Sequence, residues 1–343
     1  MTKDARAWLD LTVMRSTKQL LSVVVPVHNE RDVLPEFHSR LGNVLDSLTG
    51  IAAEVLYVND GSTDQSLETL QRLHADDARV AVVDLSRNFG KEIALAAGLD
   101  FAQGDAVVVI DADLQDPPEL IPELVKGWQQ GYDNVYAKRV ARHGETLLKK
   151  ATARAFYGVI QRISRVEIPA DTGDFRLLSR RAVVALQRLR EQHRFTKGLF
   201  AWVGYKSKEV TYERDPRFAG ETKWSYWRLW NFAIEGITSF STVPLKIATY
   251  VGAITALAAF AYGTFIVLET LIYGNPVAGY PSLMAVVLFL GGVQLVGLGV
   301  VGEYLGRTFN EVKNRPLYFV NDYVPADATK DLTRTDAAAP RST

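Results

Sequence analysis

The stretch Val107-Val-Val-Ile-Asp-Ala-Asp-Leu-Gln-Asp-Pro-Pro118 decides how the rest of the chain is interpreted. Its apolar half has the β-branched residues of a buried strand, and it ends abruptly at Asp111 and Asp113. Carboxylates are costly to bury, whereas the ligands of open α/β sheets bind in the crevice beyond the strand ends. Taken alone, the pair could equally belong to a solvated loop, so the neighbouring sequence has to decide.

The same order of apolar strand, polar turn and helical pattern occurs three times earlier in the chain. These strands are expected at Leu20–Pro26, Val55–Val58 and Val80–Leu85, each followed by a turn rich in Asn, Asp, Ser or Gly. Strands that alternate with helices indicate an α/β fold with a mostly parallel sheet and crossover helices. The turns then open on one edge of the sheet, where their polar side chains can converge on one ligand.

The acidic residues at this edge favour a hard cation. Asp111 and Asp113 offer carboxylate oxygens, and their stretch contains no His or Cys. Such ligands suit Mg²⁺ or Mn²⁺, which usually bind together with substrate phosphates. The sequence therefore predicts a site for a divalent cation and a phosphate-bearing substrate.

Composition excludes several classes of protein. The chain has 343 residues, enough for one large or two small domains, and its 39 basic residues balance 39 acidic ones, so no overall field attracts nucleic acid. It has no cysteine, and therefore no disulfide or thiolate metal site. Residues 1–18 are expected to form a flexible N-terminus without the apolar segment of a secretion signal, which would keep the catalytic region in the cytoplasm.

Two uncharged apolar segments near the C-terminus are long enough to cross a membrane. As a helix, Ile247–Leu268 would span about 33 Å at ~1.5 Å per residue, close to the ~30 Å hydrocarbon core of a bilayer. Ser282–Gly302 has a similar length. A core helix of a soluble domain is the alternative, but it would be shorter and polar on one face. We therefore expect two transmembrane helices within residues 246–306.

The segments around these spans have features of a membrane surface. A basic amphipathic helix is expected at about 145–165, with an ordinary surface helix as the alternative. It would belong to a catalytic domain at 19–228, which a juxtamembrane segment at 229–245 connects to the spans. Residues 307–343 are expected to form a cytoplasmic tail that is disordered after about 325, where the composition turns polar without periodicity.

Six motifs give the chain a specific resemblance. It resembles family-2 glycosyltransferases with the GT-A fold, in the branch that transfers one sugar to a polyprenyl phosphate, which includes bactoprenol glucosyltransferases and dolichyl-phosphate mannose synthases. The similarity runs from about Leu20 to about Pro325, and the GT-A fold it implies is Rossmann-like, followed here by two transmembrane helices. The matching motifs are Val25–Glu30, Asn59–Asp64, Arg87–Lys91, Asp111–Glu119, Asp171–Arg176 and Arg217–Lys223.

The resemblance implies how a metal is held. Asp113 would be the main ligand of Mg²⁺ or Mn²⁺, Asp111 would contact the ribose or the metal shell, and Gln115 would complete the coordination. A metal that bridges the two phosphates of the departing diphosphate acts as a Lewis acid.

The resemblance also implies a nucleotide-sugar pocket. Its counterparts here are Pro26, His28, Glu30, Asp60, Asp111, Ala112, Arg139, Arg217 and Lys223. Asp60 would bind the base or ribose, and the three cations would bind phosphates, since guanidinium forks and ammonium groups suit phosphate oxygens. Without the motifs, these cations would be interpreted as solvated surface groups. The chain departs from the family at His28, often aromatic, and at Asn59, often Asp.

Three residues are implied in catalysis, namely Asp113, Asp174 and Lys223. Asp174 stands where inverting members of the family keep a candidate base. A lipid phosphate has a second pKa of about 6, so it is already largely ionised at neutral pH and needs little deprotonation. Asp174 therefore acts either as a base or as a group that orients the substrate.

The resemblance implies an inverting enzyme that moves one hexose, expected to be glucose from UDP-glucose, to undecaprenyl phosphate. It also implies a multi-pass protein of the inner membrane that works as a homo-oligomer. A different donor, such as a 4-amino-4-deoxy-arabinose derivative or GDP-mannose, is the first alternative. A non-enzymatic membrane scaffold is the second. A processive synthase is disfavoured because the chain lacks a Gln-x-x-Arg-Trp motif and further spans.

Charge predicts the topology of the two spans. Lys223, Arg228 and Lys246 precede the pair, Arg307, Lys313 and Arg315 follow it, and the connection Glu269–Pro281 has no Lys or Arg. By the positive-inside rule, a reporter fused to the C-terminus should read cytoplasmic and a tag near Asn275 should read external. A C-terminus that is protected from protease in inverted vesicles would contradict this arrangement.

Overall fold

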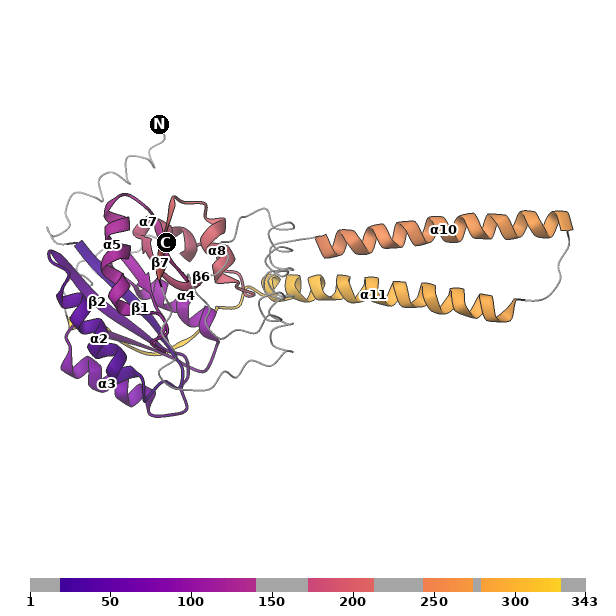
Figure 1. Cartoon of the computed structure of the whole chain (residues 1–343). Helices are drawn as coiled ribbons and strands as arrows, with labels where there is room; N and C mark the ends of the chain where they lie inside the picture. The colour runs from indigo at the N-terminus through magenta and orange to yellow at the C-terminus, as the bar shows by residue number, and fades with distance from the viewer. Residues whose placement is uncertain (1–18, 140–171, 213–242, 274–278, 328–343) are drawn as a thin grey trace, which may run out of the picture.

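The computed structural model describes residues 19–139, 172–212, 243–273 and 279–327 (Figure 1). The helix expected at about 145–165, most of the juxtamembrane segment 229–245, and Arg217 with Lys223 lie outside the described residues. So do residues 1–18 and the tail beyond 327, and their expected roles stay predictions.

The described part consists of an α/β domain and two long helices. The strands are β1 (Gln19–Val27), β2 (Ile51–Asn59), β3 (Val80–Leu85), β4 (Ala106–Val109), β5 (Asn134–Arg139), β6 (Thr172–Ser179), β7 (Ser207–Tyr212) and β8 (Val320–Val324). The helices are α2 (Leu34–Asp46), α3 (Ser66–Asp76), α4 (Lys91–Phe101), the 3-10 helix η1 (Pro118–Leu120), α5 (Ile121–Gln129), α7 (Arg180–Gln187), α8 (Thr196–Trp202), α10 (Val243–Tyr273) and α11 (Tyr280–Val312).

The described strands form one sheet in the order β7-β5-β6-β4-β1-β2-β3-β8. β1 pairs in parallel with β2 and β4, and β2 pairs in parallel with β3, so the carboxyl ends of these four strands lie at one edge. β6 is antiparallel to β4 and β5, and β8 is antiparallel to β3. The α/β fold and its parallel centre are confirmed, and antiparallel strands make the sheet mixed toward both ends.

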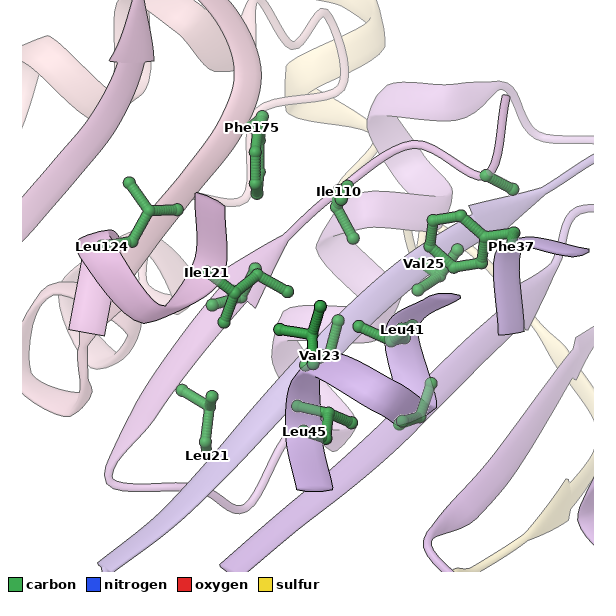
Figure 2. Close-up of a cluster of buried hydrophobic side chains, with 14 of the residues drawn as sticks. Leu21, Val23, Val25, Phe37, Leu41, Leu45, Ile110, Ile121, Leu124 and Phe175 are labelled. Atoms are coloured by element: carbon green, nitrogen blue, oxygen red, sulfur yellow. The ribbon is translucent and has the colours of Figure 1, made fainter. Parts of the chain in front are cut away.

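Alternation along β1 supplies a core on each face of the sheet. Figure 2 shows the odd-numbered residues of β1 on the side of α2, where they meet a buried aromatic and two buried leucines, namely Phe37, Leu41 and Leu45. Val24, between them in sequence, belongs to the core on the opposite face, with Leu95 and Leu99 of α4. Each such fully buried aliphatic side chain contributes about 1.5–3 kcal/mol of transfer free energy, so the strand is fixed from both sides.

Helix α4 packs closely on the sheet because it has a glycine at the contact. A Cβ added at Gly98 would lie 2.2 Å from Val24 Cγ1 and 3.2 Å from Val58 Cγ2. Any side chain there would push α4 away from β1 and β2, and with it the loop that precedes the helix.

The two long helices α10 and α11 lie side by side and project from the α/β domain as a hairpin (Figure 1). Within them, Leu245–Phe265 and Phe289–Val312 are long and apolar enough to cross a membrane by length and composition, and neither is buried inside the protein. Large apolar side chains such as Phe260 and Leu295 are exposed along the hairpin. An apolar surface of this extent needs an apolar environment, which matches the two spans expected here.

After α11 the chain returns to the α/β domain, in the yellow segment of Figure 1. Sequence analysis expected no strand in residues 307–343, but Val320–Val324 form β8 at the edge of the sheet. Leu317 and Ala326 on either side of it are buried. A five-residue segment with two adjacent polar residues, Asn321 and Asp322, is a weak strand pattern in sequence, and its pairing with β3 depends on contacts that only the folded domain provides.

Gly98 provides a test of the packing of α4. Gly98→Val should lower the free energy of unfolding by about 1–3 kcal/mol, because overpacking forces the helix and strands apart. The matched control is Gly42→Ala in α2, where the nearest atom to the added Cβ is Arg79 Nη2 at 3.7 Å. The control should be neutral or stabilising by up to about 1 kcal/mol, as for Gly to Ala in a helix. Denaturant unfolding of the solubilised protein measures both; equal effects would contradict the prediction.

Candidate active site

The loops after β1, β2 and β3 meet around His28 and Asp60. His28 Nδ1 lies 2.9 Å from the backbone oxygen of Asp60, and the side-chain nitrogen of Asn88 lies 3.2 Å from His28 Nε2. Residues more than 30 positions apart are therefore brought to one end of the sheet, as the parallel order of the strands requires. His28 itself is exposed.

Asp60 has a structural partner that sequence analysis did not foresee. It is buried, and its two carboxylate oxygens accept the backbone N–H groups of Phe89 at 2.7 Å and Gly90 at 2.9 Å. These bonds hold the loop between β3 and α4. A role of Asp60 toward a base or ribose stays a prediction, and its observed contacts show how it shapes that part of the site.

Two residues in left-handed backbone conformations shape the neighbouring turns. Gly61 has φ +57°, and a Cβ there would lie 2.3 Å from the backbone nitrogen of Asn88, so only glycine fits. Asn29 has φ 57°, and its side-chain oxygen accepts the backbone N–H of Thr63 at 2.8 Å. Asn tolerates this conformation better than most residues, because its short amide bonds to nearby backbone.

The centre of the site is an ion bridge made by Lys91, the first residue of α4. Its ammonium lies 2.7 Å from Asp111 Oδ2 and 2.5 Å from Asp174 Oδ2. In the sequence, Lys91 is the last residue of the motif Arg87–Lys91, and the motif alone predicts no role for it. A lysine that follows a strand, together with acids at other strand ends, was the pattern that could have indicated an ion pair. Lys91 and Asp174 are 83 residues apart, so the sequence does not show that they are in contact.

The bridge sets the charges of its members. Burial by itself would raise the pKa of Asp174, but Lys91, together with Lys197, lowers it well below its usual range. Desolvation opposes the charge on Lys91, but its two carboxylate partners raise its pKa above the ordinary value. Burial and the nearby charge of Asp174 raise the pKa of Glu92. Asp174 is therefore ionised at neutral pH, and its Oδ1 atom is buried without a hydrogen-bond partner.

The residues predicted to hold a metal share one turn after β4. Leu114 has φ 58°, and the backbone N–H of Gln115 donates to Asp113 Oδ1 at 3.1 Å. The described residues contain no group of three or more His, Cys, Asp or Glu that could hold a metal alone. Mg²⁺ and Mn²⁺ bound with a diphosphate need only one or two carboxylates, since phosphate oxygens and water fill the other positions. Asp111 and Asp113 fit this arrangement, with one oxygen of Asp111 engaged by Lys91.

The structure also describes four further residues that are predicted to bind the nucleotide sugar. Pro26 is in β1 opposite Val58, and Glu30 is half-buried beyond it. Ala112 is buried with its side chain in the core, so it can reach a ligand only through its backbone. Arg139 is the last residue of β5, where its backbone pairs with β7.

A polar cavity of about 160 Å³ lies beside β6. Its cationic lining residues are Arg176, which is buried, and Lys197 of α8. The Arg176 guanidinium stacks 3.8 Å from the centre of the Phe200 ring and donates to the Gly173 carbonyl at 2.9 Å. Burial lowers the pKa of Arg176 to about 10. Two cations thus line the cavity, and one of them, Arg176, lies two residues from Asp174 in β6.

Comparisons with known proteins identify the family of the chain. Residues 22–186 match Glycosyl transferase family 2, and residues 243–308 match the GtrB C-terminal hairpin. The chain is 48% identical over 300 residues to the prophage bactoprenol glucosyl transferase homolog of Escherichia coli, covering 88% of this chain and 98% of that one. The chain belongs to glycosyltransferase family 2.

Two further relatives of this family-2 chain are informative. An uncharacterized glycosyltransferase of Synechocystis sp. is 56% identical over 302 residues, covering 88% of this chain and 95% of that one. Among solved structures, glucosyl-3-phosphoglycerate synthase from Mycobacterium tuberculosis, in complex with Mn²⁺, UDP-glucose and phosphoglyceric acid, is 22% identical with a TM-score of 0.44. That comparison covers 64% of this chain and 78% of the synthase.

Lys91→Met tests the ion bridge in this glycosyltransferase. Without the ammonium, the pKa of buried Asp174 should rise, so its ionised form should be lost as pH falls through the raised value. The acidic limb of the pH profile of kcat/KM should therefore move to higher pH, and activity at neutral pH should fall by about 10²-fold, typical of a lost electrostatic element. Lys126→Met, an exposed position of α5, is the control. An unchanged pH profile would contradict this role of Lys91.

Proposed function

We propose that this family-2 glycosyltransferase moves one glucose from UDP-glucose to a polyprenyl phosphate and inverts the anomeric centre. One observation carries the proposal: the acidic strand-end site and the apolar hairpin α10–α11 occur in one chain. A nucleotide sugar is soluble in water, whereas a polyprenyl chain stays in the bilayer, since burying each CH₂ is worth about 0.8 kcal/mol. An enzyme that joins the two needs both parts.

Relatives named bactoprenol glucosyl transferase support glucose as the sugar and a polyprenyl phosphate as the acceptor. Three of them, from Shigella phages SfII, SfV and SfX, are 46–48% identical to this chain over 97–98% of their lengths. The similarity includes both the α/β domain and the hairpin. Undecaprenyl phosphate is the bacterial lipid that we propose as the acceptor.

The donor would lie across the carboxyl ends of β1–β4. In this proposal His28, Glu30 and Asp60 surround the base and ribose, since their loops meet there. Arg139, Arg217 and Lys223 would contribute charge to the diphosphate, since such cations favour phosphate oxygens.

A divalent metal fits the turn after β4. When bound, Mg²⁺ or Mn²⁺ would neutralise the charge that develops on the departing diphosphate. Asp113 and Asp111 would hold it, with Gln115 next to them. Lys91, bonded to Asp111, would hold that carboxylate in place and add positive charge near the leaving group.

Asp174 would face the acceptor from the opposite side of the ion bridge. Its Oδ1 atom has no hydrogen-bond partner and its carboxylate is ionised, so it can accept a hydrogen bond from a hydroxyl of the bound sugar and orient it. A phosphate nucleophile is largely ionised at neutral pH, so orientation is the role that we favour over proton removal. Attack from this side would invert the anomeric centre.

We also propose a location and an assembly. The hairpin would span the inner membrane with the catalytic domain and both termini in the cytoplasm, since the short connection has no basic residue. The exposed apolar faces of α10 and α11 would be covered by lipid and by further copies of the chain in a homo-oligomer.

A panel of labelled nucleotide sugars tests the substrate assignment. Membranes that contain the protein should move label into the lipid phase from UDP-glucose, and not from GDP-mannose or a UDP-4-amino-4-deoxy-arabinose derivative. Label from another donor would replace glucose and keep the reaction class. No label from any donor would favour a scaffold.

Metal dependence is tested by EDTA and by Asp113→Asn. Chelation should abolish transfer and added Mg²⁺ or Mn²⁺ should restore it, whereas the variant should lose about 10²-fold or more in kcat and not recover. Glu119→Gln, which removes a surface ion pair with Arg40, is the control and should keep full activity. Full activity of the wild type in EDTA would contradict the metal assignment. Full activity of Asp113→Asn would favour a non-enzymatic scaffold.

A further inference from the structure

A chain of polar contacts joins the C-terminal strand β8 to the loop after β2. The side-chain nitrogen of Asn321 in β8 donates to Asp84 Oδ2 at 2.8 Å, and that of Asn59 at the end of β2 donates to Asp84 Oδ1 at 2.7 Å. Asp84 is 7% exposed. A carboxylate can only accept hydrogen bonds, so its two oxygens fix both amide groups in the donating orientation.

This chain of contacts ends at a segment that we call the donor loop, after the nucleotide-sugar donor. We define the donor loop as residues 86–90 with the turn 59–62 beside it. Asn59 Oδ1 accepts the backbone N–H of Ser62 at 3.3 Å. The next residue, Asp60, holds the N–H groups of Phe89 and Gly90. A shift of Asn59 would therefore displace the residues that surround His28.

A second contact acts on the beginning of the donor loop. The backbone N–H of Ser86 donates to the carbonyl of Phe319, 3.0 Å away, just before β8. The pairing of β3 with β8 shifts register between Asp84 and Leu85, at the point where the loop departs. The strand thus fixes both the side chain of Asp84 and the backbone direction of the loop.

The near end is tied to the second apolar helix. Only residues 313–319 separate α11 from β8. Glu311 in the last turn of α11 accepts the backbone N–H of Gln192 at 2.7 Å, and Tyr318 donates to Asp100 of α4 at 2.8 Å. The rings of Phe101 and Tyr323 lie 4.6 Å apart. These contacts connect α11 and β8 to the α/β domain, β8 and its preceding segment through α4.

We propose that Asn321 is a positioning residue for the nucleotide-sugar site, acting through Asp84 and Asn59 on the donor loop. The site for the nucleotide sugar is complete only when β8, the strand that follows α11, is paired with β3. The position of α11 therefore affects how the nucleotide sugar binds. The inference rests on the proposed function in assigning this loop to the donor. It adds a contribution from a segment that lies more than 200 residues from the loop in the sequence.

Binding of UDP-glucose to the solubilised full chain, measured by calorimetry, tests the inference. Asn321→Ala removes one of the two side-chain amides that donate hydrogen bonds to Asp84. The Kd for UDP-glucose and the KM for UDP-glucose should therefore each rise by about three- to tenfold. The KM for polyprenyl phosphate should not change. Asp322→Asn is the matched control on the same strand: the Asp322 side chain is exposed, lies opposite Asp84 in the strand pairing and accepts the backbone N–H of Tyr323 at 2.9 Å. It changes the charge opposite Asp84 and keeps the hydrogen bond from Asn321, so it should leave the Kd for UDP-glucose unchanged.

An exchange of the two groups separates positioning from general stability. Asn321→Asp alone puts two carboxylates together and should weaken donor binding at least as much as Asn321→Ala. Adding Asp84→Asn should rescue it, because the amide at position 84 can accept from Asn59 and donate to the carboxylate at position 321. Melting temperatures are measured in parallel, since a merely structural role would not move the two Michaelis constants differently.

The outcomes are distinct. Unchanged Kd in Asn321→Ala, an equal rise in both Michaelis constants, or no rescue by the exchange would overturn the role of Asn321 while leaving the proposed function intact. A wild-type chain that binds no UDP-glucose would overturn the proposed function, and this inference with it.

Discussion

The parallel pairing of β1 with both β2 and β4 is the constraint on which the rest of the structure depends. Val24 lies opposite Leu56 on one side and Val109 on the other, and all three are buried. Because side chains alternate between faces, a shift of one residue would turn the whole apolar set of β1 to the wrong core. The register that satisfies both cores also sends each following loop to the same edge.

That edge collects carboxylates, and their mutual repulsion has to be compensated. Lys91 does this from the first turn of α4, between Asp111 and Asp174. Its position depends on the close approach of α4 to the sheet, which Gly98 permits. Packing of a glycine on one face of α4 thus affects the electrostatics of a site two helical turns away, where Lys91 keeps the carboxylate of Asp174 ionised.

The apolar hairpin exposes large apolar side chains, whereas the α/β domain buries them, and β8 connects the two parts. It covers the edge of β3, which would otherwise present unpaired backbone groups. The same strand brings an amide group to buried Asp84 and so reaches the loop beside His28. The strand that protects the edge of the sheet is therefore also the one that connects the apolar hairpin to the loop beside His28.

The α/β class, four of the strands, the two apolar helices and the acidic turn can be predicted from the amino-acid sequence, because they follow from local periodicity and from residues close together in the chain. The sequence also singled out Asp174 from a motif. It did not reveal that Asp60 holds a backbone loop, that Lys91 bridges two acids, or that β8 joins the sheet. Those contacts join residues 29, 83 and more than 200 positions apart, and only tertiary packing decides which polar groups share a buried place.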